Sequence, residues 1–306
     1  MQDTKELPNL YVVDAQDWKG LFTLNQSFLS HFIFRGQSNY KWKLSTSLER
    51  HITTLHSDSS WKNNTHREYE KKMLQEFKWK YPIYEQHNIP KSKDDIEWLS
   101  IMQHYGVPTR MLDFSKSLYV AMFMAIDGCI EEYKNASIWM FNKNILTIHS
   151  YNSDKDRTQS YISDSDLREH CYKNANSVLA GEKTEQLLFL IEPKIGFERI
   201  SRQQGIFVMP AKIDSPFEDI LQKFCNIKTQ QEIRLQELIG YSYRHSNPLD
   251  KIPIIKINLP FRYKYLITKS LEQMNITAEI LYSDLNGLAK YVSRLRFFDY
   301  SIYTNE

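Results

Sequence analysis

The chain has 306 residues, of which 42% are hydrophobic and 13% are aromatic, so it can bury a large core. Its 39 basic and 37 acidic side chains leave a net charge of +2, which excludes an overall electrostatic attraction to nucleic acid or to a membrane surface. No apolar run approaches the roughly 20 residues that span a bilayer and no secretory leader is evident, so we expect a soluble, cytoplasmic protein without a membrane partner.

The first half of the chain alternates between strand-like and helix-like segments. Short runs of β-branched and aromatic residues predict strands, and apolar residues at helical spacing between charges predict helices. In chain order these are strands over 10–14 and 31–36, helices over 65–81 and 93–106, a short buried strand over 107–115, a strongly apolar helix over 117–130 and a strand over 136–143. Pro82 is expected to stop the first of these helices.

The second half begins with a polar, turn-rich stretch over about 142–186, which indicates an insertion with short helical pieces. After it we predict, in chain order, strands over 186–193 and 202–210, helices over 215–225 and 229–240, a strand over 251–260 and helices over 264–274 and 282–298. There is no internal repeat and no low-complexity linker, so one domain over 1–306 is expected.

The order of these elements predicts a mixed α+β fold. We expect the strands of 32–35, 109–114 and 204–209 to lie in one sheet system, because a strongly apolar helix needs a sheet to cover it. The helix of 117–128 is then buried against that sheet.

Cysteine and histidine spacing gives no metal site. Cys129, Cys171 and Cys225 are odd in number and widely separated, which predicts reduced thiols. The nine histidines show no H-E-x-x-H or similar spacing. No metal is expected.

Four motifs carry a family resemblance. They are FRGQ at 34–37, QHYGVPTRMLDFSKSLYVAMFMA at 103–125, RQQGIFV at 202–208 and ILYSDLNGLAKYV at 280–292. Together they resemble the FRG domain, a bacterial family named for its Phe-Arg-Gly signature, over about residues 30–293. The implied single FRG domain has core motifs over 30–141 and 187–293, separated by the polar insertion.

The order of the motifs is also similar to that of the ADP-ribosyltransferase superfamily. In that superfamily a first strand supplies Arg or His, a second strand leads into a buried helix, and a third strand carries a carboxylate. The resemblance implies a split-sheet core of this type with peripheral helices, NAD as a substrate and no metal.

Arg35 ends the apolar run of the first motif, and its planar guanidinium can bind a phosphate through two hydrogen bonds. Cleavage of the nicotinamide glycosidic bond of NAD passes through an oxocarbenium-like state, so a site needs a clamp for the phosphates and a polar group on the reacting ribose. We expect Arg35 to be the clamp, Gly36 to let the backbone approach the nucleotide closely, and Gln37 to bond a ribose hydroxyl. The alternative is a buried structural arginine paired with a carboxylate such as Asp113.

The central motif is dense in polar side chains, namely Gln103, His104, Tyr105, Thr109, Arg110, Asp113 and Ser115. On a strand, Asp113 and Ser115 share one face and Arg110 lies on the other. We predict that Arg35 and Asp113 open onto one cleft with His104 or Tyr105, and that Tyr105 or Phe114 stacks on a flat base. We include His104, Tyr105, Arg110 and Ser115 among the NAD-binding residues. The alternative is a buried structural network of His104, Arg110 and Asp113.

The third motif departs from the superfamily pattern. It contains Gln203 and Gln204, where most active ADP-ribosyltransferases use a glutamate. A glutamine can bond a ribose hydroxyl but supplies no negative charge. We assign Arg35, Asp113 and Gln204 as the catalytic residues, with the acid coming from Asp113 or from Glu198.

Two classes of function follow from these residues. In the first, the protein is an NAD-dependent ADP-ribosyltransferase that modifies RNA, DNA or protein, as a toxin or effector in bacterial phage defence with an antitoxin or chaperone partner. In the second, it is a non-catalytic sensor that binds a nucleotide or a partner in the same cleft. A carboxylate within reach of the space between Arg35 and Asp113 favours the transferase, whereas glutamines alone favour the sensor.

Overall fold

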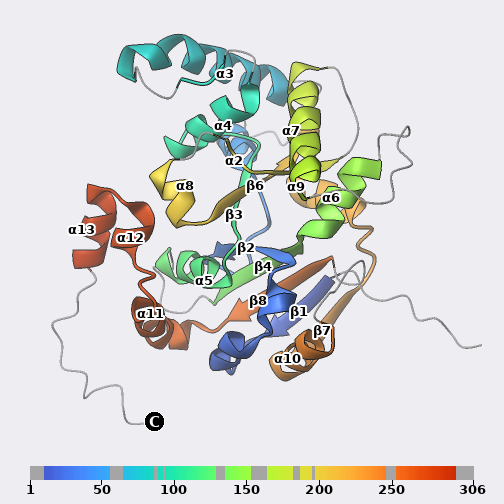
Figure 1. Cartoon of the computed structure of the whole chain (residues 1–306), viewed down its shortest axis with the longest axis vertical. Coiled ribbons are helices and arrows are strands. Elements are labelled where there is room, and N and C mark those ends of the chain that lie inside the picture. Colours follow the sequence, from blue (N-terminus) through green and yellow to red (C-terminus); the bar gives the residue numbers. More distant parts are fainter. Residues whose placement is uncertain are drawn as a thin grey trace, which may run out of the picture.

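The computed structural model describes residues 10–55, 65–85, 89–91, 94–128, 135–152, 164–181, 187–194, 197–245 and 253–293. Its strands form one mixed sheet of 8 strands in the order β5-β6-β3-β2-β4-β8-β1-β7. The sheet runs through the middle of the molecule, with helices on both sides and across one end (Figure 1). The predicted mixed fold with the three named strands in one sheet is therefore confirmed.

The strands are β1 (Leu10–Asp14), β2 (Phe32–Gln37), β3 (Leu112–Ser115), β4 (Ala136–Asn142), β5 (Leu188–Ile191), β6 (Gly205–Pro210), β7 (Gln230–Arg234) and β8 (Ile254–Leu259). The helices of the first half are η1 (Trp18–Thr23), α1 (Gln26–Leu29), α2 (Ser47–Leu55), α3 (Thr65–Tyr84), α4 (Asp95–His104), α5 (Leu118–Asp127) and α6 (Lys143–Asn152). Those of the second half are α7 (Asp164–Ala180), α8 (Glu198–Arg202), α9 (Phe217–Phe224), α10 (Leu235–Arg244), η2 (Phe261–Tyr263), α11 (Lys264–Glu272), α12 (Ala278–Tyr282) and α13 (Leu285–Ser293).

The apolar helix α5 is buried against the sheet, as predicted. Ser117 caps its N-terminus, because the Ser117 side chain accepts a hydrogen bond from the Val120 backbone N–H. The helix packs on the face of β2 that carries Phe32 and Phe34, both of which are buried. Burial of this kind is the main stabilising term for the fold.

Gly36 brings β2 and α5 into direct backbone contact. A Cβ atom at this position would lie 2.2 Å from the Ala121 carbonyl oxygen and 2.5 Å from the Ala125 backbone nitrogen. The space that a side chain would fill belongs to the helix backbone, so Gly36 is required for the packing of β2 on α5, and its expected role in the approach of a nucleotide stays a prediction.

Gly36→Ala should lower the free energy of unfolding by at least about 1–3 kcal/mol, because the added methyl meets backbone atoms that cannot rotate away. Urea denaturation measures this loss. Gly240→Ala is the matched control, since a Cβ there makes ordinary contacts within α10 and alanine favours a helix. A Gly36→Ala protein as stable as the wild type would contradict this packing.

The sheet is nearly divided between β2 and β3. These strands share a single antiparallel residue pair, Phe34 with Ser115, whereas β2 pairs with β4 over its full length. Beyond the shared pair β2 and β3 diverge, since no other residue pair joins these two strands in the described part of the chain. The sheet is thus continuous, but it opens at the point where the first and second motifs meet.

Two predicted element boundaries were wrong. The segment 229–240 is not all helix: Gln230–Arg234 forms β7, a polar edge strand that pairs in parallel with β1, and α10 begins only at Leu235. Pro82 does not stop α3, which ends at Tyr84. Pro82 has no backbone N–H to donate within α3, and the helix ends two residues after it.

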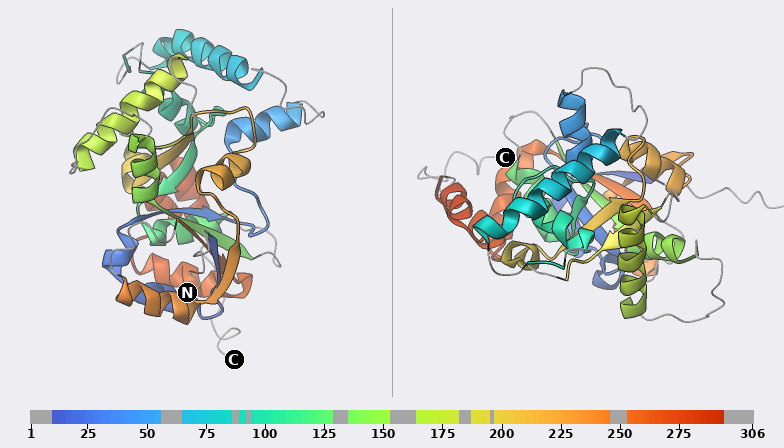
Figure 2. Two further views of the ribbon diagram at one scale, coloured as in Figure 1. Left: turned by 90° about the vertical axis from the view of Figure 1, so that its right-hand side faces the viewer. Right: turned by 90° about the horizontal axis from the view of Figure 1, so that it is seen from above.

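The polar stretch of 142–186 is more ordered than expected. It contains α6 and the long helix α7, and α7 buries Tyr172, Ala175 and Val178 in a cluster shared with α4, β5 and β6. Both views of Figure 2 show α7 beside α3 at one end of the molecule. The rest of the stretch, together with Cys129 and residues 294–298, lies outside the described residues.

The described cysteines, Cys171 and Cys225, are both buried. Burial raises the pKa of Cys225 to about 12, so this thiol is not reactive at neutral pH. None of the helices in the described ranges combines the length and the apolar character that a membrane crossing needs.

Candidate functional site

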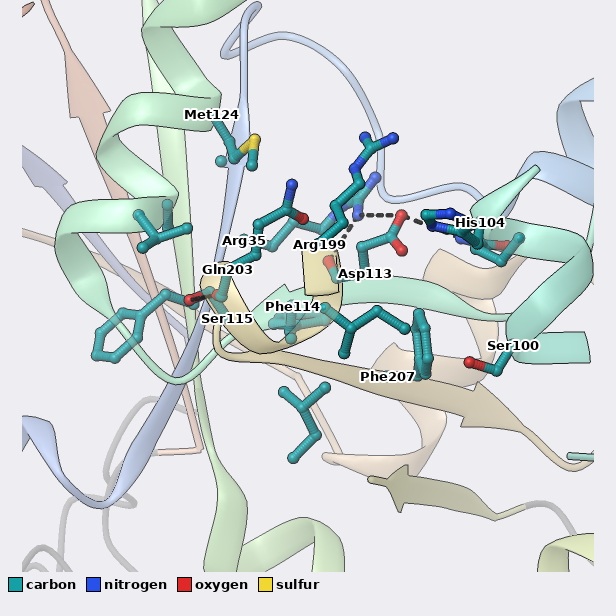
Figure 3. A pocket seen from close by; sticks show the side chains of 18 of the residues that line it. Arg35, Ser100, His104, Asp113, Phe114, Ser115, Met124, Arg199, Gln203 and Phe207 are labelled. Atoms are coloured by element: carbon teal, nitrogen blue, oxygen red, sulfur yellow. Dashed lines mark hydrogen bonds and ion pairs between the residues drawn. The ribbon is translucent and has the colours of Figure 1, made fainter. Parts of the chain in front are cut away.

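A cavity of about 320 Å³ opens where β2 and β3 diverge. It is bounded by these strands, β6, α5, α8, the end of α4 and the end of α12. Figure 3 shows its side chains gathered around one space. Its polar lining residues are Arg35, Ser100, Gln103, His104, Asp113, Ser115, Arg199, Gln203 and Tyr282.

Arg35 spans the opening between the two strands. Its Nη1 atom donates a hydrogen bond of 2.7 Å to the Asp113 carbonyl oxygen and lies 3.9 Å from the Asp113 carboxylate. This bond takes the place of a sheet bond that the diverging strands cannot make. The Nε–H of Arg35 is buried and has no partner among the described residues, so the guanidinium keeps a free donor.

Burial lowers the pKa of Arg35, an effect that Asp113 opposes and the nearby Arg50 charge increases. The guanidinium stays protonated at neutral pH, because an arginine starts from a value above 12. Burial and the Arg50 charge thus destabilise the charged guanidinium of Arg35, and a bound anion would stabilise it.

Asp113 supplies the only carboxylate among the described residues that line the cavity. Its side chain is 62% exposed and accepts a hydrogen bond of 3.0 Å from the Gln103 Nε2 atom. The amide of Gln103 and the guanidinium of Arg35 therefore hold the carboxylate in place while one side of it stays open. A ligand hydroxyl can reach it there.

Arg199 adds a second cation from α8. Its guanidinium lies 4.9 Å from the centre of the Tyr282 ring, and the Tyr282 hydroxyl donates a hydrogen bond of 2.8 Å to Asp127. With Arg35 and Arg199 against Asp113, the lining carries a net positive charge. Such a cavity favours an anionic ligand.

His104 forms one wall, where its ring stacks on Phe197 with the ring centres 4.5 Å apart. Burial lowers the pKa of His104, the Arg199 charge lowers it further, and Asp284 opposes both effects. The ring is therefore neutral at pH 7, and it can accept a proton.

His104 should titrate below its ordinary pKa of 6.5, and a bound anion should raise that pKa by neutralising Arg199. Because the folded pKa is the lower one, the stability from the neutral ring is present above pH 6.5 and is lost as the pH falls below it. Proton NMR titration with and without ADP-ribose measures both effects, and the spectrum of His104→Gln assigns the signal. An unchanged pKa in the ligand-saturated protein would place the anion elsewhere.

Ser115 and Gln203 close the end of the cavity near α12. The Ser115 hydroxyl donates to the Gln203 carbonyl oxygen at 2.8 Å, and the Gln203 amide donates to the Leu281 carbonyl oxygen at 3.0 Å. Asp113 and Ser115 share the face of β3 that was predicted. Gln204, the predicted catalytic glutamine, is exposed in a turn at φ 48° and does not line the cavity.

Two predicted NAD-binding residues are structural. Gln37 is buried, and its side chain accepts from the Trp139 indole N–H at 2.8 Å and donates to the Lys43 carbonyl oxygen. Arg110 is buried in an ion pair with Glu70 and does not line the cavity. Their hydrogen bonds are already made within the protein, so neither is available to a ligand.

Two further expectations need correction. Tyr105 is 57% exposed and lines a different surface groove with residues of α3, although it lies next to His104. Glu198, one candidate for the acid, does not line the cavity and pairs with Arg202. Of the predicted set, the structure gathers Arg35, Gly36, His104, Asp113 and Ser115 around the cavity.

Sequence reasoning missed Arg199 and Tyr282 as site residues. Arg199 lies on the short helix α8, which carries no periodic pattern, and Tyr282 lies in the fourth motif. The signal that could have found them is their position in the sequence, because Arg199 lies just before the third motif and Tyr282 lies within the fourth. In the described ranges, no group of three or more His, Cys, Asp and Glu side chains is placed to hold a metal ion.

The comparison with protein families agrees with the motifs. Residues 30–134 match the model of the FRG domain, which supports the family expected from the sequence. The matched segment includes β2, the end of α4, β3 and α5, which build the larger part of the cavity. No curated protein and no solved structure matches the chain significantly.

Proposed function

We propose that the cavity binds NAD and transfers its ADP-ribose part to an acceptor, which is RNA, DNA or protein. The observation that carries the proposal is Arg35 at the opening of the sheet, with an unpartnered buried Nε–H, beside a second arginine and a single carboxylate. Arginine donors of this kind suit phosphate oxygens. The near separation of the sheet between β2 and β3 supports an ADP-ribosyltransferase-like core.

The cavity has separate polar and apolar parts. Its volume of about 320 Å³ is at the small end for ligand pockets, so it suits one half of a dinucleotide. Met124, Ile206 and Phe207 offer apolar surface for a flat ring, and the arginines suit the phosphates.

In the proposed reaction the bond between ribose and nicotinamide breaks, and its electron pair leaves with nicotinamide. A new bond joins the same ribose carbon to an acceptor oxygen or nitrogen, which gives its proton to the neutral His104 or to water. Asp113 stabilises the positive charge that develops on the ribose. The proposal includes a role as a toxin or effector in phage defence, which an antitoxin or chaperone partner would inhibit.

A non-catalytic nucleotide sensor is the second candidate. One observation favours it. The polar side chains that line the cavity with Arg35 include the amides of Gln103 and Gln203, and the carboxylate of Asp113 is held by Arg35 and Gln103. A sensor would bind the nucleotide in the same cavity and leave its glycosidic bond intact.

Asp113→Asn separates the two functions. The variant should lower the transfer of label from NAD by about a hundredfold, because the amide keeps the shape but loses the charge. It should bind ADP-ribose about as tightly as the wild type. Label transfer and calorimetric binding measure this, with Glu198→Gln as the control outside the cavity. Full transfer by Asp113→Asn would remove Asp113 from the mechanism.

A further inference from the structure

A second, smaller hollow lies on the other side of Arg35 and Asp113. Its volume is about 100 Å³, so it fits a small anion but not a whole nucleotide. Three residues, Arg35, Gln103 and Asp113, line both this hollow and the larger cavity. The side chains of Arg35 and Asp113 therefore lie between the larger cavity and the smaller hollow and border both.

Arg50 gives the smaller hollow its charge. It lies on α2, lines the hollow with Ser47 and Arg35, and is held by a hydrogen bond from its Nη1 to the Ser45 carbonyl oxygen. In the described part of the chain, Asp113 is the only carboxylate that lines this hollow, so the two guanidinium groups leave a net positive charge.

The smaller hollow also has open space at its rim. Gly106 borders it, and a Cβ atom at Gly106 would meet no heavy atom within 4 Å. The rim of the hollow at Gly106 is therefore open to solvent.

We propose that the hollow between Arg35 and Arg50 is a phosphate subsite, separate from the larger cavity. Two guanidinium groups around a space of this size match the oxygens of one phosphate group. The proposal rests on the proposed function only for the source of that phosphate. The source is either the acceptor nucleic acid, whose reactive group would then approach Asp113 from the side opposite to NAD, or NAD itself.

Inorganic pyrophosphate is the direct probe of the subsite. At constant ionic strength it should raise the melting temperature of the wild-type chain and of Arg234→Ala, an exposed arginine on the far edge strand β7. The rise should be clearly smaller in Arg50→Ala, where only the larger cavity is left to bind the anion, and intermediate in Arg50→Lys, which keeps the charge without the planar fork. Equal rises in the wild type and Arg50→Ala, or no rise in the wild type, would overturn the proposal.

Two ligands then identify the source of the phosphate. If it belongs to an acceptor, Arg50→Ala should weaken the binding of a short single-stranded oligonucleotide about tenfold or more and leave ADP-ribose binding unchanged. If it belongs to NAD, the same loss should appear for ADP-ribose. Unchanged affinity for both ligands would overturn the subsite. Failure of NAD turnover would instead reject the transferase, because the pyrophosphate response does not depend on catalysis.

Discussion

Arg35→Ala is expected to lower ADP-ribose transfer by about a hundredfold or more. The substitution removes charge-assisted hydrogen bonds to the phosphates, each worth about 1.5–3 kcal/mol. Arg35→Lys should restore little activity, because lysine keeps the charge but loses the planar fork. Label transfer from NAD and melting temperature should be measured on the same preparations.

The melting temperature distinguishes a ligand-binding arginine from a structural one. Arg35 also bridges the diverging strands through the Asp113 carbonyl oxygen, so some loss of stability is expected. Transfer should nevertheless fall far more than the folded fraction, whereas Arg234→Ala should match the wild type in both. A loss of transfer that only follows the loss of folded protein would assign Arg35 to the architecture.

Arg110→Ala should lower the free energy of unfolding by about 3–5 kcal/mol, which is the largest expected effect on stability. The Arg110 Nε atom lies 2.9 Å from both carboxylate oxygens of Glu70, and its Nη1 donates to the Ala211 carbonyl oxygen at 2.9 Å. Both side chains of the pair are almost fully buried. The substitution leaves Glu70 as an uncompensated charge in the core, and urea denaturation measures the cost.

A double substitution tests the cause of that loss. Arg110→Met with Glu70→Leu removes both charges and should recover most of the stability, because two apolar side chains do not carry the desolvation cost. If the free energy of unfolding of Arg110→Ala lies within about 1 kcal/mol of the wild-type value, the buried pair does not have this importance for stability. A double variant no more stable than the single one would assign the loss to packing.

Local patterns predicted most of the sheet and the buried helix. The strand β2 and the helix α5 are strongly apolar, and their residues have few alternatives. The strand β7 could not be predicted in this way, because its sequence QQEIR has helix-forming residues and no alternation. Its pairing with β1, more than two hundred residues away, decides its conformation.

The site was predicted in part, for a related reason. The alternation of β3 correctly placed Asp113 and Ser115 on one face, but it could not show that Arg110 has a partner in Glu70 on α3. The positions of Gln203 and Gln204 depend on one turn, in which Gln204 takes a positive φ and does not line the cavity. A shift of one residue exchanges the two glutamines, and no local pattern fixes it.

Nicotinamide release from NAD by the purified wild-type chain tests the central claim most directly. The cavity is proposed to break that bond only while Arg35 and Asp113 are in place. Chromatography should therefore show nicotinamide formed in equal amount to ADP-ribose attached to RNA, DNA or protein, and the release should be lost in Asp113→Asn. Tight binding of NAD with no nicotinamide released in the presence of any of these acceptors would contradict the transferase and leave the sensor.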